Sequence, residues 1–323
     1  MKISILYPQQ PSDVAQLAPY ARLVREHDLA RLWTGQSFVV ESHVALASLA
    51  GQGLAVPVGI GTALAALRTP YDAALQARSL AMLLGERVDV AYGAADPAFV
   101  TSITGSPLAR PATYTAEYAR LVRQLLDGDL AVSDLERLRM SARLPPVAHP
   151  EVQVGAGVLR PGMARRARDT DFAVTWLSPP GYVRDTLLPA LTRPDGTRPR
   201  VVSHIHLAVE RPGRNPYLLA QMGCGNHLAR EHYASMLRQA GLDISTHDPV
   251  SGARQLVQHR VLRYGSPDAL AEELLELGSG VLDEVILNLT PVSLTLGDEA
   301  ALTDLHEIVG ALSARQRPIP AVR

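Results

Sequence analysis

The sequence predicts an α/β protein of the (β/α)8 class, the TIM-barrel architecture. Short apolar runs rich in β-branched residues alternate with longer runs that have helical spacing, and eight of the short runs resemble strands. The connections are long enough for helical crossovers, so we expect neighbouring strands to be parallel and buried on both faces. The clearest example is residues 56–95, which are patterned as strand, turn, helix, turn and strand. Recurrence of this unit along the chain favours the barrel.

The first half of the chain supplies four strands and the helices between them. The predicted strands are residues 2–8, 30–35, 56–62 and 87–93. The predicted helices are residues 14–29, whose apolar side chains recur on one face, 42–53, which glycine ends, and 71–84, which follows a proline suited to a first helical turn.

The second half supplies four more strands. These are residues 151–157, which follow a proline-rich breaker, 172–178, 200–210 and 283–291. Helical spacing is found at residues 114–126, 162–168 and 182–191. An open doubly wound sheet is the alternative, but no G-x-G-x-x-G motif follows the first strand, where a dinucleotide-binding fold would carry it.

The 323 residues are expected to form one barrel domain, residues 1–323, with two insertions. The insertions are residues 128–150 and residues 212–264, the latter largely helical around 226–241. Insertions of this kind on a barrel shape a pocket or an interface.

Composition excludes several functions. The net charge of −1 provides no field for nucleic acid or an acidic membrane. Cys224 is the single cysteine, so no internal disulfide or multi-cysteine metal site can form. His227 with Glu231 or His232 is a common pattern of exposed helices and no HExxH motif occurs, so we expect no metal. No signal peptide or uninterrupted apolar span is present, so we expect a soluble, cytoplasmic protein.

The order of several segments resembles the luciferase-like flavin- or deazaflavin-dependent oxidoreductases. The matching residues are LWTGQSF with SHVALASLAG, VGIGTALAALRTPYDAALQARSLAML with LGERVDVAYGAADP, PPVAHPEVQVGAG with PGMARRARDTDFAVTWL, and YGSPDALAEELLELGSGVLDEVILNL. Each segment is weak alone, but together they cover nearly the whole chain. The resemblance implies a barrel that binds an isoalloxazine-type ring at the carboxyl ends of its strands.

Small residues at strand ends are the candidate cofactor site. At the third strand the resemblance implies a bulge or a non-proline cis peptide against the ring, although a strand end that merely tolerates small side chains is the alternative. Glycines after the fifth strand can expose backbone N–H groups to a phosphate, or can form only a tight turn. The candidate cofactor-binding residues are Gly61, Thr62, Ala63, Tyr92, Gly93, Ala94, Gly155, Ala156, Gly157, Thr175 and Trp176.

Few polar residues are placed for catalysis. Strand alternation sends His204 and His206 to the same side, and a neutral histidine facing a pocket can move a proton. Gln36 stands where many deazaflavin-using relatives carry an acidic residue and a histidine, so it can hydrogen-bond but cannot act as an acid. We therefore name Gln36 and His206 as candidate catalytic residues. The candidate substrate-binding residues are Gln9, Ser37, His204 and Asn288.

The expected function is F420-dependent hydride transfer to or from a small organic substrate. The scarcity of protein acids and bases fits an enzyme whose cofactor supplies the chemistry. Reduction of a C=C or C=N bond, including dehydroamino acids in modified peptides, is a hypothesis based on the length of the second insertion. FMN-dependent monooxygenation and a non-catalytic flavin-binding barrel are the alternatives. The resemblance also implies a homodimer.

Overall fold

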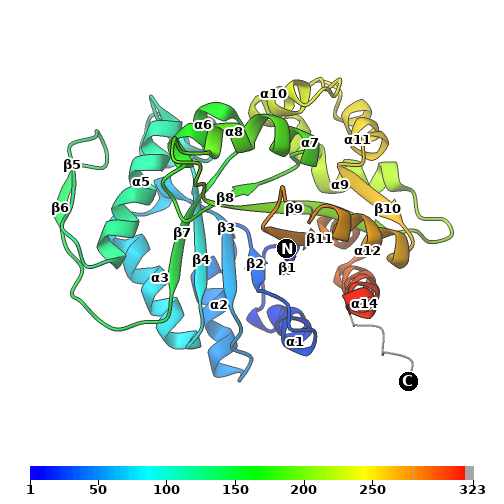
Figure 1. Cartoon of the computed structure of the whole chain (residues 1–323), viewed down its shortest axis with the longest axis horizontal. Helices are drawn as coiled ribbons and strands as arrows, with labels where there is room; N and C mark the ends of the chain where they lie inside the picture. The colour runs from blue at the N-terminus through cyan, green and yellow to red at the C-terminus, as the bar shows by residue number, and fades with distance from the viewer. Residues whose placement is uncertain (279, 317–323) are drawn as a thin grey trace.

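The computed structural model describes residues 1–278 and 280–316, and there eight parallel strands close into a barrel (Figure 1). Each strand pairs with the next in sequence, and pairing of the last strand with the first closes the ring. The predicted (β/α)8 barrel is therefore confirmed. Its strands are β1 (Lys2–Leu6), β2 (Leu32–Thr34), β3 (Val58–Leu64), β4 (Val88–Gly93), β7 (Val152–Gly157), β8 (Phe172–Thr175), β9 (Arg200–Val209) and β11 (Glu284–Asn288).

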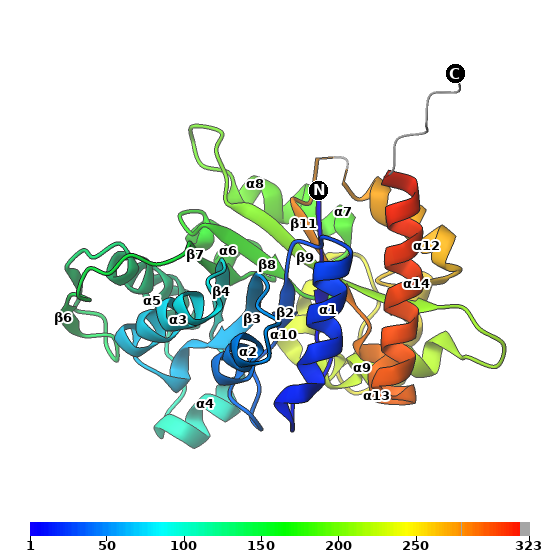
Figure 2. The same ribbon diagram turned by 90° about the horizontal axis from the view of Figure 1, so that it is seen from below.

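Helices cover the outside of the barrel (Figures 1 and 2). They are α1 (Ala18–Glu26), α2 (Ser42–Gly51), α3 (Pro70–Leu84), α4 (Pro97–Thr104), α5 (Pro111–Leu126), α6 (Pro161–Ala167), α7 (Pro180–Tyr182), α8 (Leu188–Leu191), α12 (Pro267–Glu276), α13 (Thr290–Leu296) and α14 (Asp298–Gln316), with short turns at Val14–Leu17, Ala65–Leu67 and Val183–Leu187. In α3, the Thr69 hydroxyl accepts from the Asp72 amide at the start, and Gly85 ends the helix with φ +66°. None of the described helices is long and apolar enough to cross a membrane.

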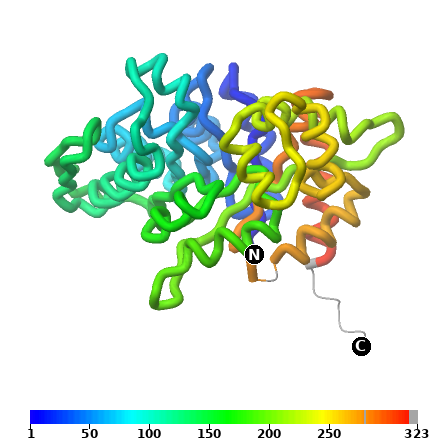
Figure 3. Tube along the Cα trace, turned by 90° about the horizontal axis from the view of Figure 1, so that it is seen from above, coloured from blue at the N-terminus to red at the C-terminus, as the bar shows by residue number. Residues whose placement is uncertain are grey.

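The two insertions have different structures. Within residues 128–150, β5 (Ala131–Ser133) and β6 (Met140–Ala142) form an antiparallel hairpin beyond α5 (Figure 1). Within residues 212–264, the helices α9 (Pro216–Leu228), α10 (Glu231–Gln239) and α11 (Pro249–Gln258) group together (yellow-green to yellow in Figure 3). The strand β10 (Leu262–Gly265) then pairs with the outer half of β9. The hairpin and β10 were not predicted from the sequence.

Two aromatic rings fill the middle of the barrel. A Cβ on Gly59 would lie 2.4 Å from the Trp33 ring, and one on Gly155 would lie 2.6 Å from the Phe172 ring. These glycines are needed because the rings pack directly against bare backbone. The rings are 5.8 Å apart, edge to face.

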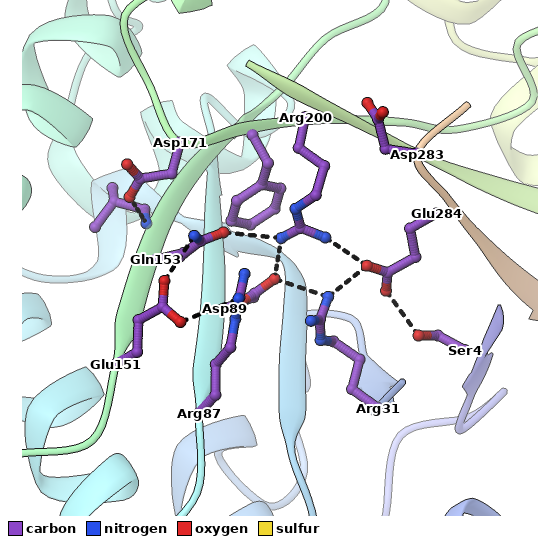
Figure 4. Close-up of polar contacts among 12 residues, drawn as sticks. Ser4, Arg31, Arg87, Asp89, Glu151, Gln153, Asp171, Arg200, Asp283 and Glu284 are labelled. Atoms are coloured by element: carbon purple, nitrogen blue, oxygen red, sulfur yellow. Dashed lines mark hydrogen bonds and ion pairs between the residues drawn. The ribbon is translucent and has the colours of Figure 1, made fainter. Parts of the chain in front are cut away.

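A charged layer, made of Arg31, Asp89, Arg200 and Glu284, closes the amino end of the barrel (Figure 4). Arg31 Nη1 lies 2.9 Å from Asp89 Oδ2 and 2.5 Å from Glu284 Oε2, and Arg200 pairs with the same two carboxylates. The Trp33 indole also donates to Glu284 over 2.9 Å. The partly exposed Arg87 also pairs with Asp89, with Nε to Oδ1 at 2.8 Å. Three guanidinium groups thus surround two fully buried carboxylates, and burial of charge requires such partners.

Candidate active site

The mouth of the barrel is formed by the carboxyl ends of the strands, where barrel enzymes place their chemistry. At the end of β3 the Gly61–Thr62 peptide bond is cis, and the strand register shifts between Gly61 and Ala63. Both a cis peptide and a bulge therefore occur where the family resemblance placed them. The mouth residues Thr62, Gly93, Gly157 and Trp176 are all partly exposed.

Three of the predicted segments meet at Thr62. A Cβ on Gly93 would lie 2.7 Å from Thr62 Oγ1, and one on Gly157 would lie 2.9 Å from Thr62 Cγ2. The ends of β3, β4 and β7 are thus in contact, as expected for residues 61–63, 93–95 and 155–157. The absent side chains at Gly93 and Gly157 make room for a threonine of the chain itself.

Several predicted cofactor residues do not turn their side chains into the mouth. The Tyr92 ring packs on Tyr118, with centroids 4.9 Å apart, in the layer between strand and helix. The Thr175 hydroxyl donates to Ser203 Oγ over 2.9 Å on the same outer side. Because side chains alternate along a strand, adjacent residues cannot all face the interior. The outward side chains of the candidate set are those of Ala63, Tyr92, Ala156 and Thr175, whereas Ala94 remains partly exposed beyond β4.

Gly155 is also not at the mouth. It lies one layer deeper, beneath the Phe172 ring, so its missing side chain is explained by packing within the chain. The missing side chain of Gly155 therefore gives no separate support for a phosphate-binding turn, which stays a prediction.

A cluster of aromatic rings lies inside the mouth. Trp176 is 4.5 Å from His204 and 5.0 Å from His206 between ring centroids. Both histidines face the interior, on the same side as predicted, and their exposed fractions are 2% and 0%. Beside them, a Cβ on Gly61 would lie 3.5 Å from His204 Nε2.

The polar atoms of this cluster lack partners in the described part of the chain. Both ring nitrogens of His204, Nδ1 of His206 and the indole nitrogen of Trp176 are buried without a hydrogen bond. Burial lowers the pKa of His204 to about 3 and that of His206 well below its ordinary value. The two imidazoles are consequently neutral at pH 7.

Gln9, Gln36 and Ser37 are bound within the chain. The Gln9 amide donates to Ser293 Oγ over 2.6 Å. Gln36 accepts from the Leu64 amide over 3.1 Å and donates to the Ser37 carbonyl over 2.8 Å, which ties the end of β2 to the end of β3. Ser37 Oγ accepts from Val39 in a local turn. Gln36 thus uses both amide atoms within the chain, and its candidate catalytic role stays a prediction.

The second insertion covers one side of the mouth. The ring of His227, at the end of α9, lies 5.3 Å from that of Trp176, and the Tyr233 ring lies 4.9 Å from His227. Arg230 then reaches Asp96 at the start of α4, with Nη1 to Oδ2 at 3.3 Å. From the sequence, His227 was interpreted as part of an exposed helix pattern. No local signal distinguishes a helix residue that reaches across a barrel from one in solvent.

The mouth carries polar groups that a planar heteroaromatic ring can pair with. Such a ring carries donors, acceptors and an apolar face, which match the partnerless nitrogens of His204, His206 and Trp176. Two half-open hollows lie elsewhere on the described chain, one of about 390 Å³ near Met1 and His27 and one of about 290 Å³ near Arg78. We place the site at the mouth because the unsatisfied buried groups are there.

Comparison with known proteins identifies the family. The model of the luciferase-like monooxygenase family matches residues 1–284. The chain belongs to this family. A search of curated protein sequences finds no significant relative.

Solved structures share the fold over the whole chain. The F420-dependent tetrahydromethanopterin reductase of Methanopyrus kandleri is 13% identical, with a TM-score of 0.74 over 98% of this chain and 100% of that one. An F420-dependent secondary alcohol dehydrogenase is 15% identical, with a TM-score of 0.70 over 95% and 98%. The oxygenating constituent of 3,6-diketocamphane monooxygenase from Pseudomonas putida, in complex with FMN, is 13% identical, with a TM-score of 0.66 over 99% of each chain.

Family membership confirms the predicted enzyme class, a flavin- or F420-dependent oxidoreductase. The polar groups at the mouth are compatible with either ring. A comparison of the affinities of the protein for F420 and FMN distinguishes the two cofactors.

Proposed function

We propose that the protein is an F420-dependent oxidoreductase that transfers a hydride to or from an uncharged organic substrate. The observation that supports it is the set of neutral, partnerless polar groups on His204, His206 and Trp176 at the mouth. None of these groups is charged at pH 7, and a lowered pKa makes each imidazole a weak base, which favours a bound cofactor as the source of the reactivity. When bound, a deazaflavin supplies hydride transfer. Two F420-dependent enzymes among the similar structures add support.

The chain's own residues would bind and orient the ring of the cofactor and exclude water from it. Main chain at Gly61 and Thr62, with His204 and Trp176, would hold the ring. His227 and Tyr233 would shield its outer side, since they already pack over Trp176. Exclusion of water strengthens each hydrogen bond made in the site.

Titration with oxidised F420 and FMN, followed by fluorescence, tests the proposal. We expect F420 to bind more tightly, and His204→Ala to weaken its binding at least tenfold because two unsatisfied nitrogens are removed. Substrate-dependent bleaching of reduced F420 would then show an enzyme, whereas tight binding without bleaching would show a carrier. His247→Ala, at an exposed position, is the matched control. Binding of FMN alone would contradict the proposal.

FMN-dependent monooxygenation is the second candidate. The description of the matching family and the FMN complex among the similar structures favour it. Oxygen consumption with reduced FMN and substrate distinguishes the two candidates, because reduced F420 hardly reacts with oxygen.

A bulky acceptor is proposed as the substrate, including the C=C or C=N bond of a dehydroamino acid in a modified peptide. Support comes from the second insertion, whose helices border the mouth and reach Asp96. Assay of the purified protein with reduced F420 and dehydroalanine-containing peptides tests this substrate class. Failure with every such peptide, alongside turnover of a small ketone or imine, would remove it.

A cytoplasmic homodimer of single-domain chains completes the proposal. Four large apolar side chains on α2 and α3 are exposed, and they support pairing through these helices: Val44, Leu75, Met82 and Leu83. Such side chains form the centre of many two-fold interfaces.

A further inference from the structure

A chain of hydrogen bonds fixes the orientation of the Asn288 side chain. The backbone N–H of Thr290 donates to Asn288 Oδ1 over 2.9 Å. A backbone N–H can only donate, so the oxygen of this amide must face Thr290. The amide nitrogen therefore faces His206, whose Nε2 lies 3.1 Å away. Both residues are fully buried.

The same chain fixes the proton of His206. An amide nitrogen can only donate, so Nε2 of His206 must accept. Burial keeps the imidazole neutral, and a neutral imidazole carries one proton. That proton is on Nδ1, which is buried without a partner in the described residues. An unmade bond of this kind is unfavourable, and a bound acceptor would supply it.

The surroundings of His206 are uncharged. Its ring neighbour is Trp176, and the titratable groups acting on it are His204 and His227, both with pKa values lowered by burial. Among the described residues no contact links His206 to a cation or a carboxylate. An anion bound beside it would lack a counter-charge, so the fitting ligand atom is a neutral acceptor.

We infer that His206 Nδ1–H donates a hydrogen bond to an uncharged carbonyl or imine acceptor bound at the mouth, and that Asn288 is the positioning residue that holds the proton on that nitrogen. The inference rests on the proposed function for the identity of the ligand, which is the substrate or a carbonyl of the cofactor ring. The bond strengthens as negative charge develops on the acceptor. His206 is a donor in this role and does not release its proton.

The tautomer can be measured directly. In a two-dimensional ¹H–¹⁵N spectrum of the histidine side chains of the whole protein, His206 is expected to show a protonated Nδ1 and an unprotonated Nε2. His206→Gln assigns the signal. In Asn288→Asp the carboxylate only accepts, so the proton is expected to move to Nε2. A wild-type proton on Nε2, or an unchanged proton position in Asn288→Asp, overturns the inference. The wild-type spectrum alone decides the first point, even if the variant does not fold.

Kinetics test the role of the donor. Loss of one positioned donor lowers kcat by about 10²–10³-fold, so Asn288→Asp is expected to show a loss of that size. A loss in kcat with unchanged F420 affinity identifies the substrate as the acceptor, and weakened affinity for F420 or FMN identifies the ring. Asn215→Asp is the matched control, because aspartate can replace this helix cap. Unchanged kcat and affinity in Asn288→Asp overturn the inference. Absence of turnover in wild type, with Nδ1 protonated, instead contradicts the proposed function.

Discussion

Acid is expected to destabilise the fold through the buried histidines at the mouth. Burial lowers the pKa of His204 to about 3, whereas an unfolded histidine titrates near 6.5. The unfolded chain therefore takes up a proton that the folded chain excludes, so stability falls as the pH drops below 6.5 and continues to fall to about 3. At pH 5, which is 1.5 units below the unfolded value, His204 alone costs about 2 kcal/mol.

The interval from pH 7 to pH 5 isolates the histidines from the carboxylates. His206 and His227 have lowered pKa values for the same reason, so they act in the same direction. Burial raises the pKa of Glu41, but hydrogen bonds from His43 and Val44 outweigh burial and lower this pKa to about 2. The ionised Glu41 therefore contributes stability that is lost as the pH falls below its unfolded pKa near 4.5. The loss of stability caused by protonation of carboxylates therefore begins at a lower pH than the loss caused by the histidines.

Guanidinium denaturation at pH 7 and pH 5 is the assay, with tryptophan fluorescence as the readout. The fall in unfolding free energy between the two pH values is expected to be smaller in His204→Gln than in wild type by about 2 kcal/mol. His247→Gln, which changes an exposed histidine, is expected to retain the wild-type difference. An equal fall in His204→Gln and wild type would refute the argument that His204 is held neutral by burial.

Three further perturbations probe the floor, the middle and the outside of the barrel. Gly155→Ala places a Cβ 2.6 Å from the Phe172 ring and is expected to cost about 1–3 kcal/mol in thermal unfolding. Gly162→Ala is the control, because its Cβ meets no atom within 4 Å. Equal melting temperatures of the two variants would contradict this expectation. Glu284→Gln removes a carboxylate shared by two arginines and is expected to cost about 3–5 kcal/mol in chemical denaturation, so a neutral effect would show that the charged layer is dispensable. Leu83→Arg is expected to give monomers in sedimentation velocity, and a persistent dimer would place the interface elsewhere.

The barrel could be predicted from the sequence because its strands are short apolar runs separated by helical segments. All eight predicted strands occur, including the short strand β2, which the run ARLWTG indicated. The hairpin of β5 and β6 was missed because each strand has three residues and little apolar pattern. The strand β10 was missed because its pairing with β9 depends on the path of a long insertion.

The site was predicted in part. The junction of three strands at Thr62 and the inward direction of His204 and His206 follow from strand order and alternation. Tyr92 was included because it ends the fourth strand beside small residues, although alternation sends its side chain outward. The cover by His227 is invisible in sequence because it depends on how α9 lies against the barrel.

The charged layer could have been found from the strand register. At the start of four strands a charged residue stands two positions before an inward-facing core residue. Residues two positions apart on a strand point to the same face, so these charged side chains also face the interior. These residues are Arg31, Asp89, Arg200 and Glu284. They were overlooked because a charged residue at the start of a strand also marks a strand boundary, where solvent is the more common neighbour.

Because salt bridges close the amino end of the barrel, a ligand can enter only from the carboxyl ends of the strands. Whichever of two ligands occupies the deeper position must enter first and leave last. The barrel thus sets the order in which two such ligands bind and dissociate during turnover.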